Sequence, residues 1–140
     1  MANDNYSECS RLRRIEKALL ARSDELAAES RKHDAQILDL ENKIKQYRLK
    51  LLDIISDLGI SAHDIIGIAA ETIVKRLGGV VTVVYVAMKL RDARDLQKQI
   101  ESAEGMIEEI KRWKIDIAYR IKDLHSERES YIKDQEALGC

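Results

Sequence analysis

The stretch KRLGGVVTVVYVAMKL, residues 75–90, decides which fold this chain adopts. Its β-branched run VVTVVYV locally favours a β-strand. The rest of the chain offers no second strand to pair with it, and a lone strand would leave its backbone hydrogen-bonding groups unsatisfied. A helix satisfies those groups within one segment, and local propensity is a weak signal that context overrides. We therefore expect residues 80–90 to be helical and to run directly into the segment that follows.

The same stretch is too short for a conventional transmembrane helix. Its uninterrupted apolar run, residues 77–88, covers about half to two-thirds of the roughly 20 residues that a spanning helix needs. Basic residues bracket the run closely on both sides, at Lys75, Arg76, Lys89 and Arg91. We interpret the run as the core of a helical protein and keep membrane insertion as an alternative.

Upstream of this stretch, apolar residues between Leu12 and Leu58 recur in alternating steps of three and four. This repeat is typical of a coiled-coil helix and predicts one long helix over residues 8–58. Gly59 is suited to end it, because glycine adopts the left-handed conformation at no steric cost. The strongest seam positions in this half are Ile37, Leu40, Ile44, Tyr47 and Leu51.

A second, amphipathic helix is predicted over residues 61–77. Ser61 and Asp64 have the spacing of a capping box, and Gly78 and Gly79 follow its end. Apolar residues then recur at helical spacing along one face. The central apolar residues, which we expect to form core or to contact a partner or a membrane, are Ile65, Ile66, Ile73, Val80, Val81, Val83, Val84 and Val86.

The heptad repeat returns downstream and predicts a second long helix over residues 80–138. Lys114 and Arg128 occupy seam positions, where a charged side chain costs stability and can set the register. The strongest apolar seam positions are Ile100, Ile107, Ile110, Ile117 and Ile121.

These patterns predict a single all-α domain over residues 1–140, with two long heptad helices flanking a short apolar central helix. Charged residues make up 35% of the chain and proline is absent, a composition typical of long helices. Two architectures follow: an elongated helical hairpin with antiparallel long helices, or an extended three-helix rod in which they run parallel. In the hairpin register, Leu40 faces Ile107 and Leu12 faces Gln135.

The two cysteines, Cys9 and Cys140, are too few for a disulfide scaffold, and their spacing fits no zinc motif. We expect two free thiols. The hairpin register is the one arrangement that changes this expectation, because it brings Cys9 close to the Cys140 end. A disulfide between them is then geometrically feasible.

The chain carries no recognisable catalytic or ligand-binding motif. Its histidines, His33, His63 and His125, do not have the spacing of metal ligands. The Gly-Gly pair at residues 78–79 does not match a phosphate-binding loop, and the many carboxylates fit a solvated helix face. We therefore expect no enzymatic activity, no cofactor and no metal site.

Charge and periodicity together narrow the function. Basic and acidic residues number 24 and 25, whereas nucleic-acid-binding domains carry a basic excess. No apolar signal segment is visible near the start, so we expect a cytoplasmic protein and leave leaderless export open. We expect a non-enzymatic structural or interaction protein that forms homo-oligomers through its coiled-coil seams and hydrophobic centre. The alternatives are a pore-former-like, membrane-active protein inserting residues 59–88, and a small helical regulator or inhibitor of a protein target.

Overall fold

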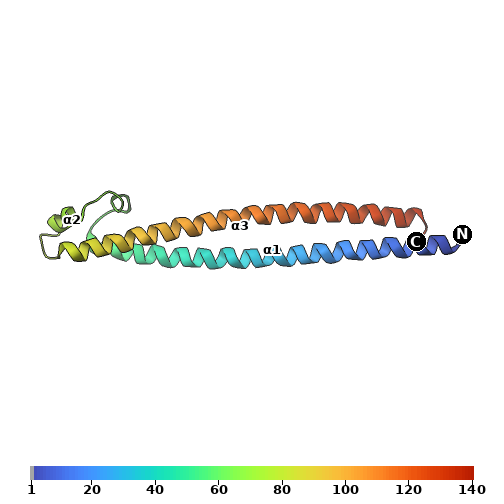
Figure 1. Cartoon of the computed structure of the whole chain (residues 1–140), viewed down its shortest axis with the longest axis horizontal. Helices are drawn as coiled ribbons and strands as arrows, with labels where there is room; N and C mark the ends of the chain where they lie inside the picture. The colour runs from blue at the N-terminus through green and yellow to red at the C-terminus, as the bar shows by residue number, and fades with distance from the viewer. Residues whose placement is uncertain (1) are drawn as a thin grey trace. The chain divides into compact units, whose positions relative to one another are not determined.

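The computed structural model describes residues 2–140, with side chains from Tyr6 onward. The helices follow one another in the order α1 (Ala2–Leu58), the 3-10 helix η1 (Ala62–Asp64), α2 (Ala70–Arg76) and α3 (Val83–Ala137). Figure 1 labels α1, α2 and α3. These residues contain no β-strand. The all-α class is confirmed, and so is the helical state of the valine-rich run from Val83 onward.

Helix α1 ends at the glycine that the sequence indicated. Gly59 has a φ of +63°, and its N–H donates to the Ser56 carbonyl at 3.2 Å. The next N–H, that of Ile60, donates to the Ile55 carbonyl at 3.2 Å. This pair of bonds is a Schellman cap, which satisfies carbonyls left open at the end of the helix.

The expected helix over residues 61–77 is not continuous, and this prediction is wrong. The Ser61 N–H does donate to the Asp64 carboxylate at 3.4 Å, but the helix that starts there ends after three residues as η1. A regular helix resumes only at Ala70. The capping signal was therefore present, while the helix it should have started was interrupted by tertiary contacts.

Arg94 of α3 supplies those contacts. Its Nε donates to the Ile65 carbonyl at 2.9 Å, and its Nη2 donates to the Ile68 carbonyl at 3.4 Å. In a continuous α-helix these two carbonyls would accept from backbone N–H groups four residues further on. Because Arg94 takes them instead, the segment between η1 and α2 folds as turns that are attached to α3.

Helix α3 begins at Val83, three residues later than expected. Gly78 and Gly79 both have φ of +71°, and the Gly79 N–H closes α2 on the Val74 carbonyl at 3.0 Å. Thr82 then caps α3, because its hydroxyl accepts the N–H of Tyr85 at 3.1 Å. Residues 80–82 therefore form a short link between the two caps.

The chain divides into two compact units, whereas its sequence predicted a single domain over residues 1–140. Unit 2 covers Ile37–Glu108 and contains the end of α1, η1, α2 and the start of α3. Its apolar core draws on α1, α2, α3 and the turns on either side of η1, through residues such as Leu58, Ile65, Ile73 and Val86. The short central segments are thus packed against the long helices of this unit.

Unit 1 combines the chain up to Gln36 with Glu109–Cys140, the outer parts of α1 and α3. Arg128 Nη2 lies 3.3 Å from a carboxylate oxygen of Glu16, and Gln135 donates to the same carboxylate at 2.9 Å. These contacts fit an antiparallel pair close to the predicted register. In unit 2, Leu40 packs against the core cluster that contains Ile107, as that register requires.

Within each unit, α1 and α3 therefore run antiparallel, as the hairpin architecture predicted. The three-helix rod with parallel long helices is wrong. The antiparallel arrangement lets the two heptad seams cover one another within a single chain, whereas the parallel one would leave a half-seam exposed on each long helix.

Candidate interaction surface

The ten residues that we expected to join separate chains lie between α1 and α3 of the same chain. Six are buried: Ile44, Leu51, Ile100, Ile107, Ile110 and Ile117. Four are half-buried: Ile37, Leu40, Tyr47 and Ile121. A side chain that is buried within a chain offers no surface to a second one. These residues form the interior of units 1 and 2, and a role for them in joining separate chains stays a prediction.

The eight central apolar residues separate into core and surface. Ile65, Ile73 and Val86 are fully buried and Val81 is half-buried, whereas Ile66, Val80, Val83 and Val84 are exposed. Ile66 belongs to the turn next to the Arg94 contacts. The three exposed valines belong to the connection between α2 and α3 and to the first turn of α3.

We call the exposed apolar residues of this connection the turn patch: Val80, Val83, Val84, Tyr85 and Met88. The most exposed are Val80 at 87%, Val84 at 70% and Met88 at 60%. Val84 and Met88 lie one helical turn apart, opposite the face that buries Val86 and Leu90 in the core. The start of α3 is therefore apolar on both its inner and its outer face.

Basic residues flank the turn patch in the sequence. Lys75 and Arg76 end α2, and Lys89 and Arg91 follow the patch on α3. The Lys89 ammonium lies 5.7 Å from the centre of the Tyr85 ring, within the range of a cation–π interaction. Residues 75–91 contain these four basic residues and no acidic one, although the chain as a whole has a net charge of −1.

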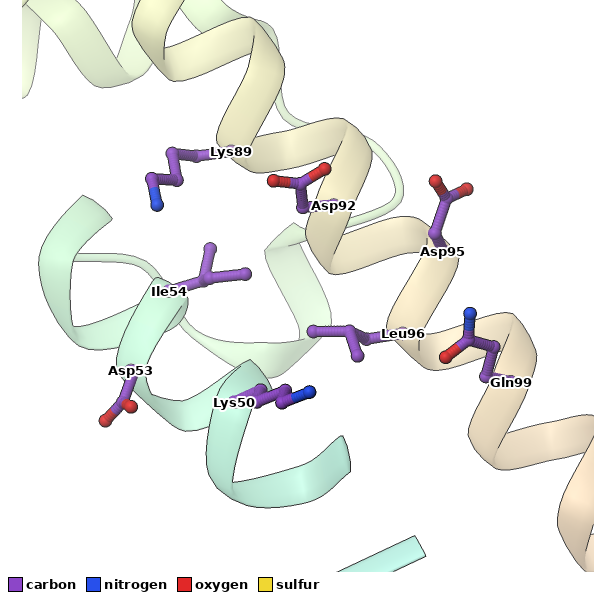
Figure 2. Close-up of a pocket in the computed structure, with 8 residues that line it drawn as sticks. All are labelled: Lys50, Asp53, Ile54, Lys89, Asp92, Asp95, Leu96 and Gln99. Carbon is purple, nitrogen blue, oxygen red and sulfur yellow. The ribbon is translucent and has the colours of Figure 1, made fainter. Parts of the chain in front are cut away.

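A second feature of unit 2 is an open groove between α1 and α3, which Figure 2 shows. Leu96 points from α3 toward α1 in this groove, and two lysines and three aspartates share its lining. General acid–base catalysis needs a carboxylate held in a shaped site close to the reacting group. Here oppositely charged side chains alternate along an open surface. The lining residues are Lys50, Asp53, Ile54, Lys89, Asp92, Asp95, Leu96 and Gln99.

In unit 1, His33 packs beside Trp113. Their ring centres are 5.8 Å apart, and His33 Nδ1 lies 3.0 Å from the Gln36 side-chain oxygen. Lys114, the charged residue at a seam position, pairs with Asp34. The His33–Trp113 and Lys114–Asp34 contacts join the paired helices, and the His33–Gln36 contact lies within α1. Over the described residues, no group of three or more His, Cys, Asp or Glu side chains is placed to hold a metal ion.

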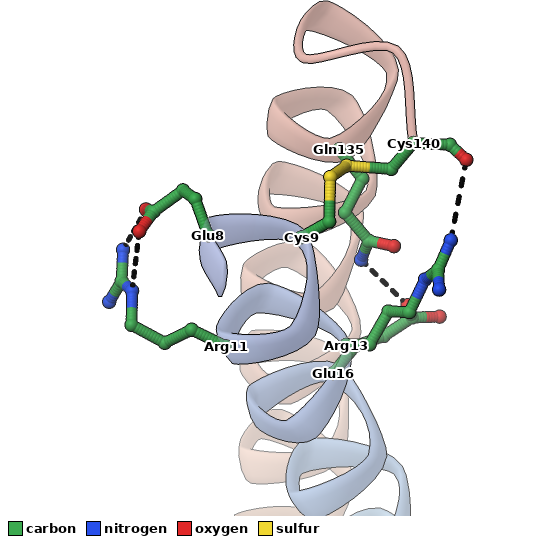
Figure 3. The surroundings of a disulfide bond; sticks show 7 residues. All are labelled: Glu8, Cys9, Arg11, Arg13, Glu16, Gln135 and Cys140. Atoms are coloured by element: carbon green, nitrogen blue, oxygen red, sulfur yellow. Dashed lines mark hydrogen bonds and ion pairs between the residues drawn. A yellow bond between two sulfur atoms is a disulfide. The ribbon is translucent and has the colours of Figure 1, made fainter. Parts of the chain in front are cut away.

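The expected free thiols are not present, because Cys9 and Cys140 form a disulfide in unit 1 (Figure 3). Their Cα atoms are 5.9 Å apart. Gly139, with a φ of +75°, turns the chain back after α3, and the Cys140 N–H donates to the Gln135 carbonyl at 2.9 Å. Gly139 was a local sequence signal for the turn that ends α3, but not for the pairing of Cys140 with Cys9.

An ion pair between Glu8 and Arg11 lies next to the disulfide, with Arg11 Nε donating to Glu8 at 3.1 Å (Figure 3). This hydrogen bond lowers the pKa of Glu8 below its ordinary value and raises the pKa of Arg11. Both side chains are open to solvent. The pair lies on the surface of the first turns of α1 and does not form a binding site.

Helical geometry would have found the turn patch from the sequence. In a helix, Val84 and Met88 must face away from Val86 and Leu90, and both pairs cannot be core at once. Treating residues 77–88 as one apolar run concealed this division. Arg94, in contrast, carries no local signal of its contacts with the carbonyls after η1.

No helix over the described residues is long and apolar enough to cross a lipid bilayer. No known protein family matches this chain, and neither a curated protein nor a solved structure is similar to it.

Proposed function

We propose that this chain is a non-enzymatic interaction protein in which the helix pairs are the scaffold and the turn patch makes the contact. The observation that carries the proposal is the exposure of Val80, Val84 and Met88 beside a fully formed core. An exposed apolar patch that is rimmed by polar side chains is characteristic of an interaction site.

Folding alone does not require the outer face at the start of α3 to be apolar, and contact through the turn patch explains it. Val86 and Leu90 already anchor the start of α3 in the core. Polar residues on the outer face would keep that anchor and increase solubility, because exposed apolar side chains contribute nothing to burial. The apolar outer face is thus better explained by contact with another surface.

In this proposal the chain associates through the turn patch and not through its heptad seams. Association through the heptad seams would require unit 1 or unit 2 to open, since the seam residues are used within the chain. Association of two copies through their turn patches would bring two sets of four basic side chains together, and like charges across an interface are unfavourable. A surface of different chemistry is the better fit.

Site-specific photo-crosslinking in the cells that make this chain tests the proposal. A photo-reactive amino acid replaces Val84 in one strain and Ser102 in a control strain. Ser102 is exposed on the same face of α3, five helical turns further along. The probe at position 84 should form an adduct with a protein or a lipid in much higher yield than the probe at position 102. Equal yields at the two positions would overturn the proposal.

A further inference from the structure

We infer that the surface met by the turn patch is an anionic lipid membrane, which the patch enters only to the depth of the headgroups and upper acyl chains. This inference rests on the proposed interaction function and names the partner of the same site. It draws on the shape of the patch, its charge, and the order of residues along α3.

The shape of the patch suits a bilayer better than a peptide. A helical peptide docks by laying its apolar face into a groove. Three grooves among the described residues of units 1 and 2 are lined by residues outside the turn patch. Side chains such as Val80 and Val84 stand out from the surface, and a fluid bilayer interface accepts protruding apolar groups without a matching pocket.

The charge around the patch selects anionic lipids. Lys75, Arg76 and Arg91 are exposed, and residues 75–91 include no acidic side chain that would be repelled. Each Lys or Arg close to an anionic membrane surface contributes about five-fold to binding. The attraction falls off within a Debye length, so it should weaken strongly as salt is added.

Tyr85 and Lys89 have the properties of residues at a membrane interface. A tyrosine combines an apolar ring with a polar hydroxyl, and a lysine can bury its aliphatic stem while its ammonium stays at the headgroups. Their cation–π contact keeps the ammonium next to the ring. The two side chains would therefore lie at the boundary between the apolar patch and the phosphate layer.

The sequence of the outer face of α3 limits the depth of entry. After Val84 and Met88, this face continues with Arg91 and then Asp95. A buried aspartate would be costly in hydrocarbon, so only the first two turns of α3 enter. This limit agrees with the finding that no helix over residues 2–140 could span a bilayer.

Flotation of the purified, oxidised 140-residue chain with lipid vesicles tests the inference. We expect the chain to float with vesicles that contain phosphatidylserine and to remain at the bottom with pure phosphatidylcholine vesicles or at high salt. The double variant Val84→Asp, Met88→Asp should lose flotation. The matched control, Leu49→Asp with Leu52→Asp, places the same charges on exposed leucines of α1 in unit 2 and should float like the natural chain.

A second variant guards against a folding artefact. Lys75→Gln with Arg76→Gln alters only exposed side chains at the end of α2 and should lower binding roughly 25-fold, two factors of five. Equal flotation of the patch variant and the Leu49, Leu52 control would overturn the inference. So would absence of flotation by the natural chain. If position 84 still crosslinks to a protein in cells, the interaction function stands and only the lipid assignment is wrong.

Discussion

Removal of the disulfide should lower the stability of the protein by a large amount, and the destabilisation should affect unit 1. The bond joins Cys9 and Cys140, which are 131 residues apart in the sequence. Closing a loop of that length removes conformational entropy from the unfolded chain worth about 5 kcal/mol at 25 °C. Replacing either cysteine by serine should lower the free energy of unfolding by up to this amount.

The packing of unit 1 explains why the effect should be local. Part of its helix interface is polar: the Ser23 hydroxyl lies 3.5 Å from His125 Nε2, and Glu16 pairs with Arg128. Unit 2 instead has a continuous apolar core that includes the segments after α1. Without the bond, the outer parts of α1 and α3 can separate while the core of unit 2 remains formed.

The assay is urea unfolding followed by far-UV circular dichroism, together with amide hydrogen exchange. Cys9→Ser, Cys140→Ser and the double variant should show the same loss of stability, because each removes the same bond. Exchange should accelerate in residues 10–36 and 109–135 and change little in the core of unit 2. A loss below about 1 kcal/mol, or equal acceleration in both units, would refute the reasoning.

Three further predictions concern the caps and the polar contacts. Gly59→Ala should lower the free energy of unfolding by about 1 kcal/mol, because an alanine is strained at a φ of +63°. Gly105→Ala should raise it by a similar amount, since the added Cβ would meet open space within α3. Urea unfolding of both variants should show changes of opposite sign. Arg94→Gln should cost about 2 kcal/mol and speed hydrogen exchange in residues 60–69, because two carbonyls lose their donors; unchanged exchange there would contradict this account. Glu16→Leu should cost about 1 kcal/mol by leaving Arg128 unpaired, and adding Arg128→Leu should restore or exceed the original thermal stability. A double variant clearly less stable than the natural chain would show that the pair is net stabilising.

Several features of the fold could be predicted because their causes are local. The heptad rhythm, the absence of proline and the glycines at residues 59 and 78 act over one or two turns of chain. They identified the long helices and the caps that end α1 and α2. The valine run was predicted to be helical and not a strand because the chain offers no partner strand.

The candidate site was predicted only in part. Val80, Val83 and Val84 were named as contact residues, but Tyr85 and Met88 were left out, and Val86 proved to be core. The mixture arose because one apolar run supplies both faces of the start of α3. Helical phase separates them, because Val84 and Met88 lie on the face of α3 opposite Val86 and Leu90.

The sequence by itself determined that the chain is helical, where its long helices end, and which side chains form apolar stripes, because helical periodicity and capping depend on neighbouring residues. Only the tertiary structure decided that the stripes cover one another within one chain, that Arg94 interrupts the central helix, and that Cys9 meets Cys140. Each of these outcomes joins residues far apart in the sequence. No local pattern specifies them, because they depend on the direction in which α3 returns along α1.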